Sequence, residues 1–148
     1  MYNSILVPVD GSEFSEKAVK EAAKLAHALG SKLLLFHAAA QHLPPLVEGM
    51  SATTRPKERA MARKEIEDWA QAVLGAAAKK AKLSNGNVEQ HFEISNSPYE
   101  AIIQAAKKHK CDLIVMASHG RRGVSGVLLG SETQKVLTHS LVPVLVVR

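Results

Sequence analysis

The stretch that decides the fold is a short apolar run followed by a long glycine-containing loop. It reads Leu113-Ile114-Val115-Met116-Ala117-Ser118-His119-Gly120, then a segment up to Leu129, then Gly130-Ser131-Glu132-Thr133. A continuous apolar run of this kind is typical of a central strand covered on both faces. The loop is longer than the connections between secondary-structure elements usually are, about 4–6 residues, and such long loops are often functional. Glycines let a backbone fold closely around a ligand and point its N–H groups inward, and this loop carries Gly120, Gly123, Gly126 and Gly130. We therefore interpret it as a cradle for an anion, in the first instance a phosphate.

The whole-chain composition is that of one soluble globular domain. The 148 residues are 46% hydrophobic and 22% charged. The apolar runs fall short of the roughly 20 residues that span a bilayer, and the N-terminus enters a strand-like run without a basic segment typical of a signal peptide. A single cysteine, Cys111, excludes an internal disulfide. These features predict a cytoplasmic location without a membrane partner.

The formal charge of +5 raises the alternative of nucleic acid or anionic lipid as a partner. However, the lysines are spread along helical segments such as Lys79–Lys82 and Lys107–Lys110, as expected of solvated helix faces. Aromatic residues that stack on bases make up 4% of the chain. We therefore predict no nucleic-acid partner.

Strand-like runs alternate with helical segments along the chain. Short apolar runs predict strands at Ser4–Val9, Lys32–Ala38, Val88–Ile94, Asp112–Ala117 and Leu141–Val147. Helical spacing of apolar residues predicts helices at Glu13–Leu29, Lys57–Leu83, Pro98–Lys110 and Ser131–His139. Between these elements, Ala39–Pro56 is expected to be a mobile loop and Ser84–Asn87 a turn.

Local signals support several of these elements. Ser12 is expected to cap the first helix, and Gly30 to end it in a left-handed conformation. Ser97, Pro98 and Glu100 predict a capping box at the third helix. The second helix is expected to bury Ala62, Ile66, Trp69, Val73 and Ala77. Val88–Ile94 alternates imperfectly, which favours an edge strand.

This alternation of strands and helices predicts an α/β domain with a mainly parallel sheet. Ligands of such open sheets bind outside the carboxyl ends of the strands, where the strand order reverses. The turn Asp10-Gly11-Ser12 follows the first strand, and the glycine loop follows the fourth. If these two strands flank the reversal, both segments face one crevice.

The common phosphate fingerprints, G-x-x-x-x-G-K-[ST] and G-x-G-x-x-G, are absent from the sequence. The sequence has instead Gly120, nine further residues, and Gly130-Ser131, with Ser131 at a helix start. A helix N-terminus offers unpaired N–H groups, here including those of Glu132 and Thr133, and a partial positive charge. The simpler alternative is that Ser131 only caps its own helix.

Asp10 is the carboxylate at the end of a central strand, and two interpretations of it stand open. In a nucleotide site it must face the ribose hydroxyls or a divalent cation, because a carboxylate repels phosphate. Alternatively, it stabilises its own turn as an Asx-turn. Arg121 and Arg122 either neutralise phosphate charge or are simply solvated.

The histidines and the cysteine do not suggest a metal or a catalytic site. His37 and His42 lack ligand spacing and have no cysteine near them, so we predict no metal ligands. His119 lies in the loop and is placed to hydrogen-bond a ligand or donate a proton, but the sequence offers no partner that orients it. Cys111 is interpreted as an inert packed thiol. We predict no catalytic residues.

The chain resembles the universal stress protein family along essentially its whole length. The residues that carry the resemblance are Ile5-Leu6-Val7-Pro8-Val9-Asp10-Gly11-Ser12, Val115-Met116-Ala117-Ser118-His119-Gly120, Gly130-Ser131 after nine residues, and Val142-Pro143-Val144-Leu145-Val146-Val147. With this resemblance, we expect residues 1–148 to form a single nucleotide-binding domain. Its fold is expected to be a Rossmann-like open five-stranded parallel sheet, with strand order 3-2-1-4-5 and helices on both faces.

The ATP-binding branch of this family has the pattern G-x-x-G, nine residues, then G-[ST]. The resemblance implies an adenine pocket from Val9, Ala38 and Met116, with Asp10 near the ribose or a metal, and phosphates on Gly120, Gly130, Ser131 and Thr133. The predicted nucleotide-binding residues are Pro8, Val9, Asp10, Ala38, Met116, Ala117, His119, Gly120, Gly130, Ser131, Glu132 and Thr133. Ala117 departs from the pattern, which has glycine there. Alanine costs about 1–2 kcal/mol if that backbone needs a positive φ, and little if it keeps strand geometry.

The resemblance also implies a homodimer in which the last strand, Val144–Val147, pairs with its mate. An apolar terminal strand of this kind would otherwise be an aggregation-prone edge. The leading hypothesis is a stress-response protein that binds ATP, with Mg²⁺ or Mn²⁺, and recognises unidentified protein partners in a nucleotide-dependent way, with at most slow hydrolysis. A nucleotide-free dimeric interaction protein is the alternative. An enzyme using His119 or Asp10 ranks last, because no dedicated general base is visible.

Overall fold

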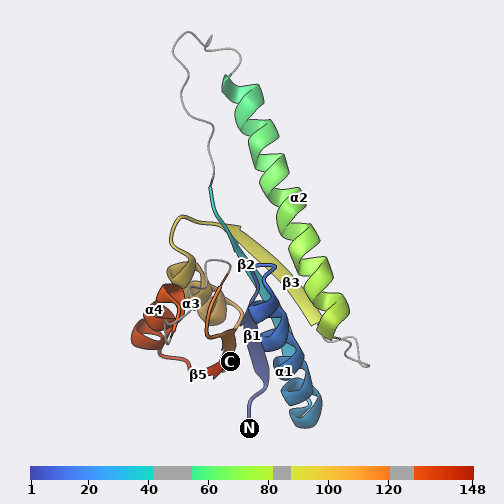
Figure 1. Cartoon of the computed structure of the whole chain (residues 1–148), viewed down its shortest axis with the longest axis vertical. Helices are drawn as coiled ribbons and strands as arrows, with labels where there is room; N and C mark the ends of the chain where they lie inside the picture. The colour runs from blue at the N-terminus through green and yellow to red at the C-terminus, as the bar shows by residue number, and fades with distance from the viewer. Residues whose placement is uncertain (42–54, 82–87, 121–128) are drawn as a thin grey trace.

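Strands and helices alternate in the computed structural model, which describes residues 1–41, 55–81, 88–120 and 129–148 (Figure 1). The elements are β1 (Ser4–Pro8), α1 (Glu13–Leu29), β2 (Lys32–Ala39), α2 (Arg55–Ala81), β3 (Val88–Ile94), α3 (Pro98–Lys108), β4 (Leu113–Ala117), α4 (Ser131–His139) and β5 (Val144–Val147). The expected turn at 84–87, most of the expected loop at 39–56, and the loop residues Arg121, Arg122, Gly123 and Gly126 lie outside the described residues.

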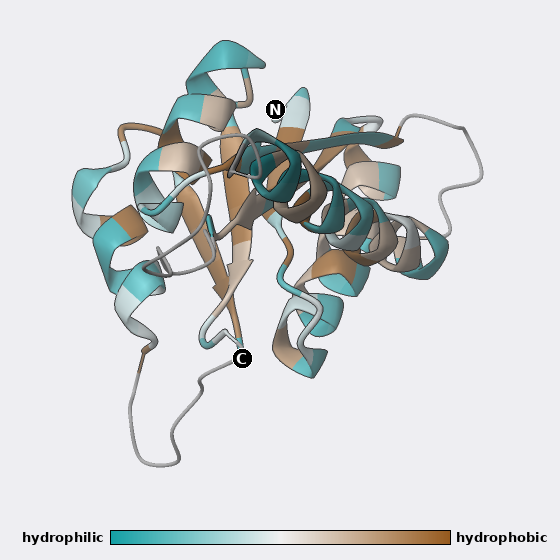
Figure 2. Cartoon of the chain, turned by 90° about the horizontal axis from the view of Figure 1, so that it is seen from above, coloured by the Kyte–Doolittle hydropathy of each residue, from teal (hydrophilic) through white to brown (hydrophobic). Residues whose placement is uncertain are grey.

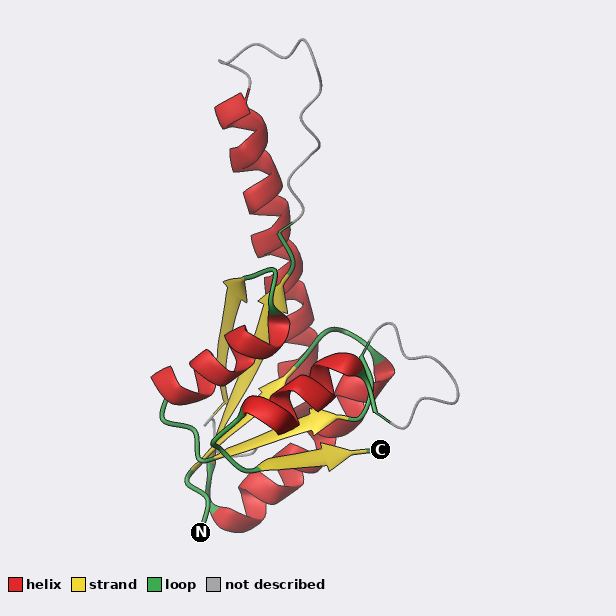
Figure 3. Ribbon diagram, turned by 90° about the vertical axis from the view of Figure 1, so that its left-hand side faces the viewer, coloured by secondary structure: helices red, strands yellow, loops and turns green. Residues whose placement is uncertain are grey.

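The five strands form one parallel sheet in the order β3-β2-β1-β4-β5, as predicted (Figure 3). The chain builds outward from β1 to β3 on one side and from β4 to β5 on the other. The strand order therefore reverses between β1 and β4, which are direct neighbours. In open α/β sheets this is the place where ligands bind.

Helices cover both faces of the sheet, because successive strand residues point to opposite sides. Ile5 and Val7 of β1 pack with α1 and α2, whereas Leu6 packs with α3 and α4. The inner strands carry the hydrophobic colours between the two more polar helix layers, whereas the edge strand β3 is largely polar (Figure 2). β4 is buried along its whole length, as its continuous apolar sequence predicts. Among the described residues, no helix is both long enough and apolar enough to cross a membrane.

The first helix begins and ends as predicted. The Ser12 hydroxyl accepts the N–H of Ser15 at 3.1 Å, which satisfies one of the unpaired donors of the first turn. Gly30 adopts φ +68° at the other end, and its N–H bonds to the carbonyl of Ala26. A left-handed residue here lets the chain leave the helix and enter β2 at once.

The third helix has the predicted first residues but not the predicted capping box. Ser97 is the N-cap and Pro98 follows, yet the Ser97 side chain makes no capping bond. The Ser97 N–H donates to the Ser95 hydroxyl, and Glu100 accepts from the Tyr99 hydroxyl instead. A carboxylate from another helix accepts an N–H of the first turn of α3: Glu132 of α4 accepts the Tyr99 N–H at 2.9 Å. The capping prediction was wrong because a residue distant in sequence supplies the acceptor.

Two further expectations are corrected. Trp69 is half exposed (50%) rather than buried, and Ala62 and Ile66 are half-buried. Val73 and Ala77 are buried as predicted, and Ala70, Leu74 and Ala81 complete the buried face of α2. The N-terminal part of α2 extends past the sheet (Figure 1), so its apolar residues have no strand beneath them, and Met61 is 65% exposed. The last strand starts at Val144 rather than Leu141, because Ser140 and Val142 form a local turn through the Ser140 hydroxyl.

At the amino edge of the sheet, Asp112 joins β1 to β4. Its carboxylate accepts the N–H groups of Asn3 and Ser4 at 2.8 and 3.0 Å. Burial acts to raise the pKa of this carboxyl, but the donors from Ser4 and Asn3 outweigh it, and the net pKa is lowered. The neighbouring Cys111 is buried, as predicted, and burial raises the pKa of its thiol.

Substituting Gly30 by alanine tests the backbone argument for α1. We expect Gly30→Ala to lower the free energy of unfolding by about 1–2 kcal/mol, because its φ of +68° disfavours a Cβ although space is open there. Gly75→Ala is the matched control, since it lies inside α2 with open space around the added Cβ. That variant should gain about 0.5–1 kcal/mol, because alanine favours helix. Urea unfolding measures both, and equal changes in the two variants would contradict the account.

Candidate functional site

The candidate site is the carboxyl edge of the sheet between β1 and β4. The turn Asp10–Ser12 follows β1, and Ser118–Gly120 follows β4. These segments meet: a Cβ placed on Gly120 would lie 2.8 Å from Oδ2 of Asp10. The two motifs that sequence inspection singled out therefore face each other across the strand reversal, as the predicted topology required.

Asp10 forms the Asx-turn that was one of the two interpretations left open by the sequence, and its role toward a ligand stays a prediction. Its Oδ1 accepts the N–H of Ser12 at 2.9 Å, which is an Asx-turn, and Gly11 adopts φ +81° within that turn. Its other oxygen, Oδ2, is the one directed toward Gly120. The turn thus fixes the carboxylate, with Oδ2 on the side of the opposite loop.

The backbone needs glycine at position 130 because of a close approach. The Gly130 N–H donates to the Ser118 carbonyl at 2.7 Å. A Cβ on Gly130 would lie 3.2 Å from that carbonyl oxygen and 3.4 Å from Cα of His119. Its φ of −65° is open to any residue, so space and not conformation selects glycine. This contact fixes the start of α4 directly above the end of β4.

The N-terminus of α4 is not capped by a side chain. Gly130 occupies the N-cap position, and Ser131 is the first helical residue, with an exposed side chain. The first intrahelical bond runs from the Gln134 N–H to the Gly130 carbonyl. By helix geometry the three preceding N–H groups, those of Ser131 to Thr133, have no intrahelical acceptor. The helix thus presents backbone donors and a partial positive charge at the crevice.

The side chains of two predicted site residues form hydrogen bonds within the protein. The Thr133 hydroxyl is buried and donates to the Ala117 carbonyl at 3.0 Å, and so holds α4 to the end of β4. The Glu132 carboxylate accepts from the Tyr99 N–H and from Lys135 Nζ, each at 2.9 Å. For both residues, the backbone N–H and not the side chain is the group suited to an anion.

Ala117 keeps strand geometry. It is the last residue of β4, lies opposite Val147 of β5, and is buried. Among the described residues, Lys110 is the one non-glycine residue with positive φ. Of the two alternatives for alanine at this position, the strained one therefore does not apply.

The residues expected around an adenine ring all lie at the carboxyl edge, but on different faces. Pro8 ends β1 and Val9 follows it. Ala38 precedes the last residue of β2, and Met116 precedes Ala117. Val9 packs in the core beneath α1 and α2, whereas Ala38 and Met116 belong to the core beneath α3 and α4. An apolar hollow of about 210 Å³ adjoins Val9 and Gly11 between α1 and α2, with Trp69 on its wall. A larger hollow, of about 720 Å³, is lined mainly by α1 side chains such as Lys20 and by Lys80 and Arg148.

His119 has a neighbour that sequence inspection did not identify. Its Nδ1 lies 3.1 Å from the Ser118 hydroxyl, and its ring centroid lies 5.6 Å from that of Phe14 at the start of α1. These contacts place the imidazole over the loop that carries Gly120. The serine hydroxyl and the Phe14 ring thus help to orient the imidazole.

A second missed residue is His37, which the sequence raised only as a metal candidate. It is buried within β2, and its Nδ1 donates to the Val9 carbonyl at 2.7 Å. The Val9 N–H in turn donates to the Phe36 carbonyl at 2.8 Å. His37 therefore anchors the residue that precedes Asp10. The signal was available, because a histidine inside an apolar strand run needs an internal partner.

Replacing His37 tests this anchoring role. We expect His37→Leu to lower the free energy of unfolding by about 1–3 kcal/mol, because it leaves the buried Val9 carbonyl without its donor. His37→Asn should recover part of that loss, since its amide places a donor near the former Nδ1. The exposed His27 gives the control, and His27→Leu should change stability by less than about 0.5 kcal/mol. Thermal and urea unfolding measure all three, and equal losses at His37 and His27 would contradict the role.

Comparison with known proteins gives one consistent result over the whole length. The model of the Universal stress protein family matches residues 1–148. The Thermus aquaticus protein named universal stress protein in QAH/OAS sulfhydrylase 3′ region is 34% identical over 148 residues, which cover 100% of both chains.

Solved structures agree with this match. The structure of the protein MJ0577, named universal stress protein MJ0577 in Methanocaldococcus jannaschii, superposes with a TM-score of 0.81 at 25% identity, covering 99% of this chain and 96% of that one. A universal stress protein solved in complex with cAMP has a TM-score of 0.71 at 28% identity, with 99% and 97% covered. The likeness therefore extends through the crevice between β1 and β4.

Proposed function

Because the chain belongs to the universal stress protein family, we propose that it binds an adenine nucleotide in the crevice between β1 and β4. The nucleotide proposed is ATP, with Mg²⁺ or Mn²⁺ as its counterion. The protein would act in the cytoplasm as a stress-response regulator whose recognition of protein partners depends on the bound nucleotide.

The main support for this proposal is that one crevice has a carboxylate on one side and anion-binding backbone donors on the other. On one side stands Asp10, whose Oδ2 faces Gly120. On the other stands the start of α4, with backbone donors at Ser131 to Thr133. A ligand that spans both sides needs hydroxyl groups or a bound cation at one end and anionic oxygens at the other. A nucleoside phosphate has this polarity.

The resulting orientation follows from electrostatics. Phosphate oxygens are attracted to the N-terminus of α4 and repelled by the Asp10 carboxylate. The ribose hydroxyls can donate to Asp10, and a divalent cation can bridge it to the phosphates. The base then lies toward the ends of β1 and β2, near Val9 and Ala38. The relative solved with cAMP supports an adenine nucleotide as the ligand class.

Chemistry beyond binding has little support from the described residues. Oδ1 of Asp10 accepts the Ser12 N–H within its own turn, and Nδ1 of His119 lies at the Ser118 hydroxyl. A general base needs a position within hydrogen-bond reach of the attacking water and a matched pKa. We therefore propose that hydrolysis is slow at most and that the bound nucleotide acts as a signal.

Substitution at Gly120 tests the nucleotide site. An added Cβ would lie 2.8 Å from Oδ2 of Asp10, so Gly120→Ala must displace the carboxylate. We expect the dissociation constant for Mg-ATP to rise about tenfold or more, corresponding to ~1.4 kcal/mol. Gly75→Ala adds the same methyl group within α2, where space is open, and should leave binding unchanged. Isothermal titration calorimetry of the wild type and both variants measures this.

Two outcomes of that titration would contradict the proposal. One is the absence of binding heat for the wild type at protein concentrations of about 100 μM, which exceed most functional dissociation constants. The other is an unchanged affinity in Gly120→Ala. The first would favour the nucleotide-free interaction protein. The second would place the nucleotide elsewhere on the chain.

We also propose that the protein is a homodimer through β5. This strand lies at the edge of the sheet and pairs on one side with β4. Its Leu145 is 45% exposed, and an apolar edge strand offers backbone groups to a second strand. A two-fold axis beside β5 would continue the sheet into the mate and cover this edge.

A charge at the centre of β5 tests the dimer. Leu145→Lys should shift the protein from dimer to monomer, because burying an unpaired ammonium at the interface is unfavourable. Leu29→Lys is the matched control, since Leu29 is similarly exposed (38%) but ends α1. Sedimentation equilibrium distinguishes the two masses. A wild-type monomer, or a dimer that survives Leu145→Lys, would contradict this interface.

A further inference from the structure

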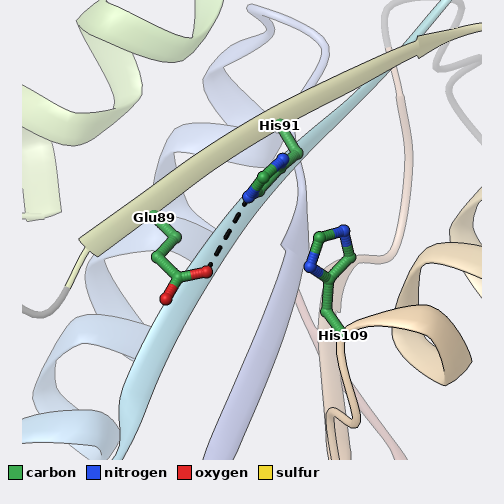
Figure 4. Close-up of side chains that lie close together, drawn as sticks. All are labelled: Glu89, His91 and His109. Atoms are coloured by element: carbon green, nitrogen blue, oxygen red, sulfur yellow. Dashed lines mark ion pairs between the residues drawn. The ribbon is translucent and has the colours of Figure 1, made fainter.

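Three potential metal ligands meet outside the nucleotide crevice (Figure 4). Glu89 and His91 lie on the edge strand β3, and His109 is the residue that ends α3. One ligand atom from each of them lies within 4.8 Å of the other two. Glu89 and His91 are exposed, and His109 is half-buried, so an ion has access from solvent.

The backbone places these side chains together in a defined way. Along β3, Val88 and Phe92 pack against the core beneath α1 and α2. Since strand residues alternate, Glu89 and His91 share the opposite face, where α3 lies. Their positions are fixed by pairing with β2, in which Glu89 is opposite Leu34 and His91 opposite Phe36.

His109 is held by the way in which α3 ends. Its N–H bonds to the Ala105 carbonyl at 3.0 Å. Lys110 then adopts a left-handed conformation with φ +54°, and the Cys111 N–H returns to the Ala106 carbonyl at 2.8 Å. This pattern of bonds is a Schellman motif, which fixes the direction of the chain after a helix. The imidazole is thereby directed at β3 by a rigid helix end.

The distances among the three groups are those of a site close to assembled. Nε2 of His91 lies 3.8 Å from Oε2 of Glu89. The ring centroids of His91 and His109 are 4.3 Å apart, with an angle of 41° between the rings. Ligands of a tetrahedral zinc ion at about 2.0–2.1 Å from the metal are ~3.4 Å apart. Binding an ion therefore requires side-chain rotations that bring the three ligand atoms from within 4.8 Å to that spacing.

The local charge is compatible with a cation. His109 is flanked in sequence by Lys108 and Lys110, and the Lys108 Nζ pairs with Glu93 at 3.5 Å. Glu89 adds a further negative charge beside the two imidazoles. The pairing of Lys108 with Glu93 leaves Glu89 to balance the charge of the bound ion.

We propose that Glu89, His91 and His109 bind a divalent transition-metal ion, with Zn²⁺ as the ion of choice. Two imidazole nitrogens and one carboxylate oxygen form a donor set that suits Zn²⁺ and disfavours Mg²⁺, which prefers oxygen ligands. The site has three protein ligands, so a water molecule completes a tetrahedron. The ion joins the edge strand β3 to the end of α3.

This site is separate from the proposed nucleotide site. β2 lies between β3 and β1, and none of the three ligands belongs to β1, β4 or α4. A failure of the Zn²⁺ proposal would therefore not bear on the nucleotide proposal, and a failure of the nucleotide proposal would not bear on Zn²⁺ binding. Sequence inspection missed the site because His109 and His91 are 18 positions apart and only the fold brings them together.

The test is a calorimetric titration of the nucleotide-free full chain with Zn²⁺, with Mg²⁺ as the competing ion. We expect one Zn²⁺ per chain, no competition by Mg²⁺, and a rise in the unfolding midpoint with Zn²⁺ concentration. His109→Gln and Glu89→Gln should each weaken Zn²⁺ binding about tenfold or more. The exposed His27 and His139 lie outside the cluster, so His27→Gln and His139→Gln are the matched controls and should bind as the wild type does.

Two results would overturn the proposal. The first is the absence of Zn²⁺ binding by the wild type at micromolar concentrations. The second is binding that survives both His109→Gln and Glu89→Gln in variants that unfold at the wild-type temperature without metal. Should a variant fail to fold, the visible absorption spectrum of Co²⁺ bound to the wild type decides independently. A spectrum of octahedral Co²⁺ without imidazole ligands would exclude this donor set.

Discussion

The contact between Asp10 and Gly120 is the constraint on which the functional end of the molecule depends. It joins a turn that follows the first strand to a loop that begins more than 100 residues later. Only a glycine at position 120 leaves room for the carboxylate, because a Cβ would come within 2.8 Å of Oδ2. The pairing of β1 with β4 brings the two segments together, and the strand reversal leaves the space above them uncovered by a crossover helix.

A second set of contacts places α4 relative to that pair. Gly130 bonds to the Ser118 carbonyl, and Thr133 bonds to the Ala117 carbonyl, so two consecutive carbonyls at the end of β4 hold the first turn of the helix. Glu132 then connects the same turn to the start of α3. The side chains of this turn serve structure, which leaves the backbone N–H groups for a ligand. Such preorganised donors need no rearrangement to bind an anion.

Much of the fold could be predicted from the sequence, because local patterns specify it. Ser12 and Gly30 define α1, and the apolar run in β4 indicates a covered central strand. A helix between successive strands returns the chain to the same edge of the sheet, which indicates parallel pairing. Errors arose where a distant residue decides the outcome. Glu132 replaces the expected Glu100 at α3, and Trp69 is half exposed although the next residue, Ala70, is buried.

The candidate site was predictable to the same extent. The glycines at 120 and 130 and the carboxylate at 10 form a pattern in the sequence. The two glycines are required because neighbouring atoms approach them closely, and not because of their backbone conformation. The contact of His37 with Val9 and the cluster around His109 were not predicted. They depend on which side chains face each other across strands and helices, and spacing along a chain does not contain that information.

The most direct test of the account is a crystal structure of the chain with an adenine nucleotide bound. In that structure we expect phosphate oxygens within hydrogen-bond distance of the backbone N–H groups of Ser131 to Thr133, and the ribose or a divalent cation at Oδ2 of Asp10. A nucleotide bound instead in the hollow lined by Lys20, Lys80 and Arg148, or one whose phosphates turn away from α4, would contradict it.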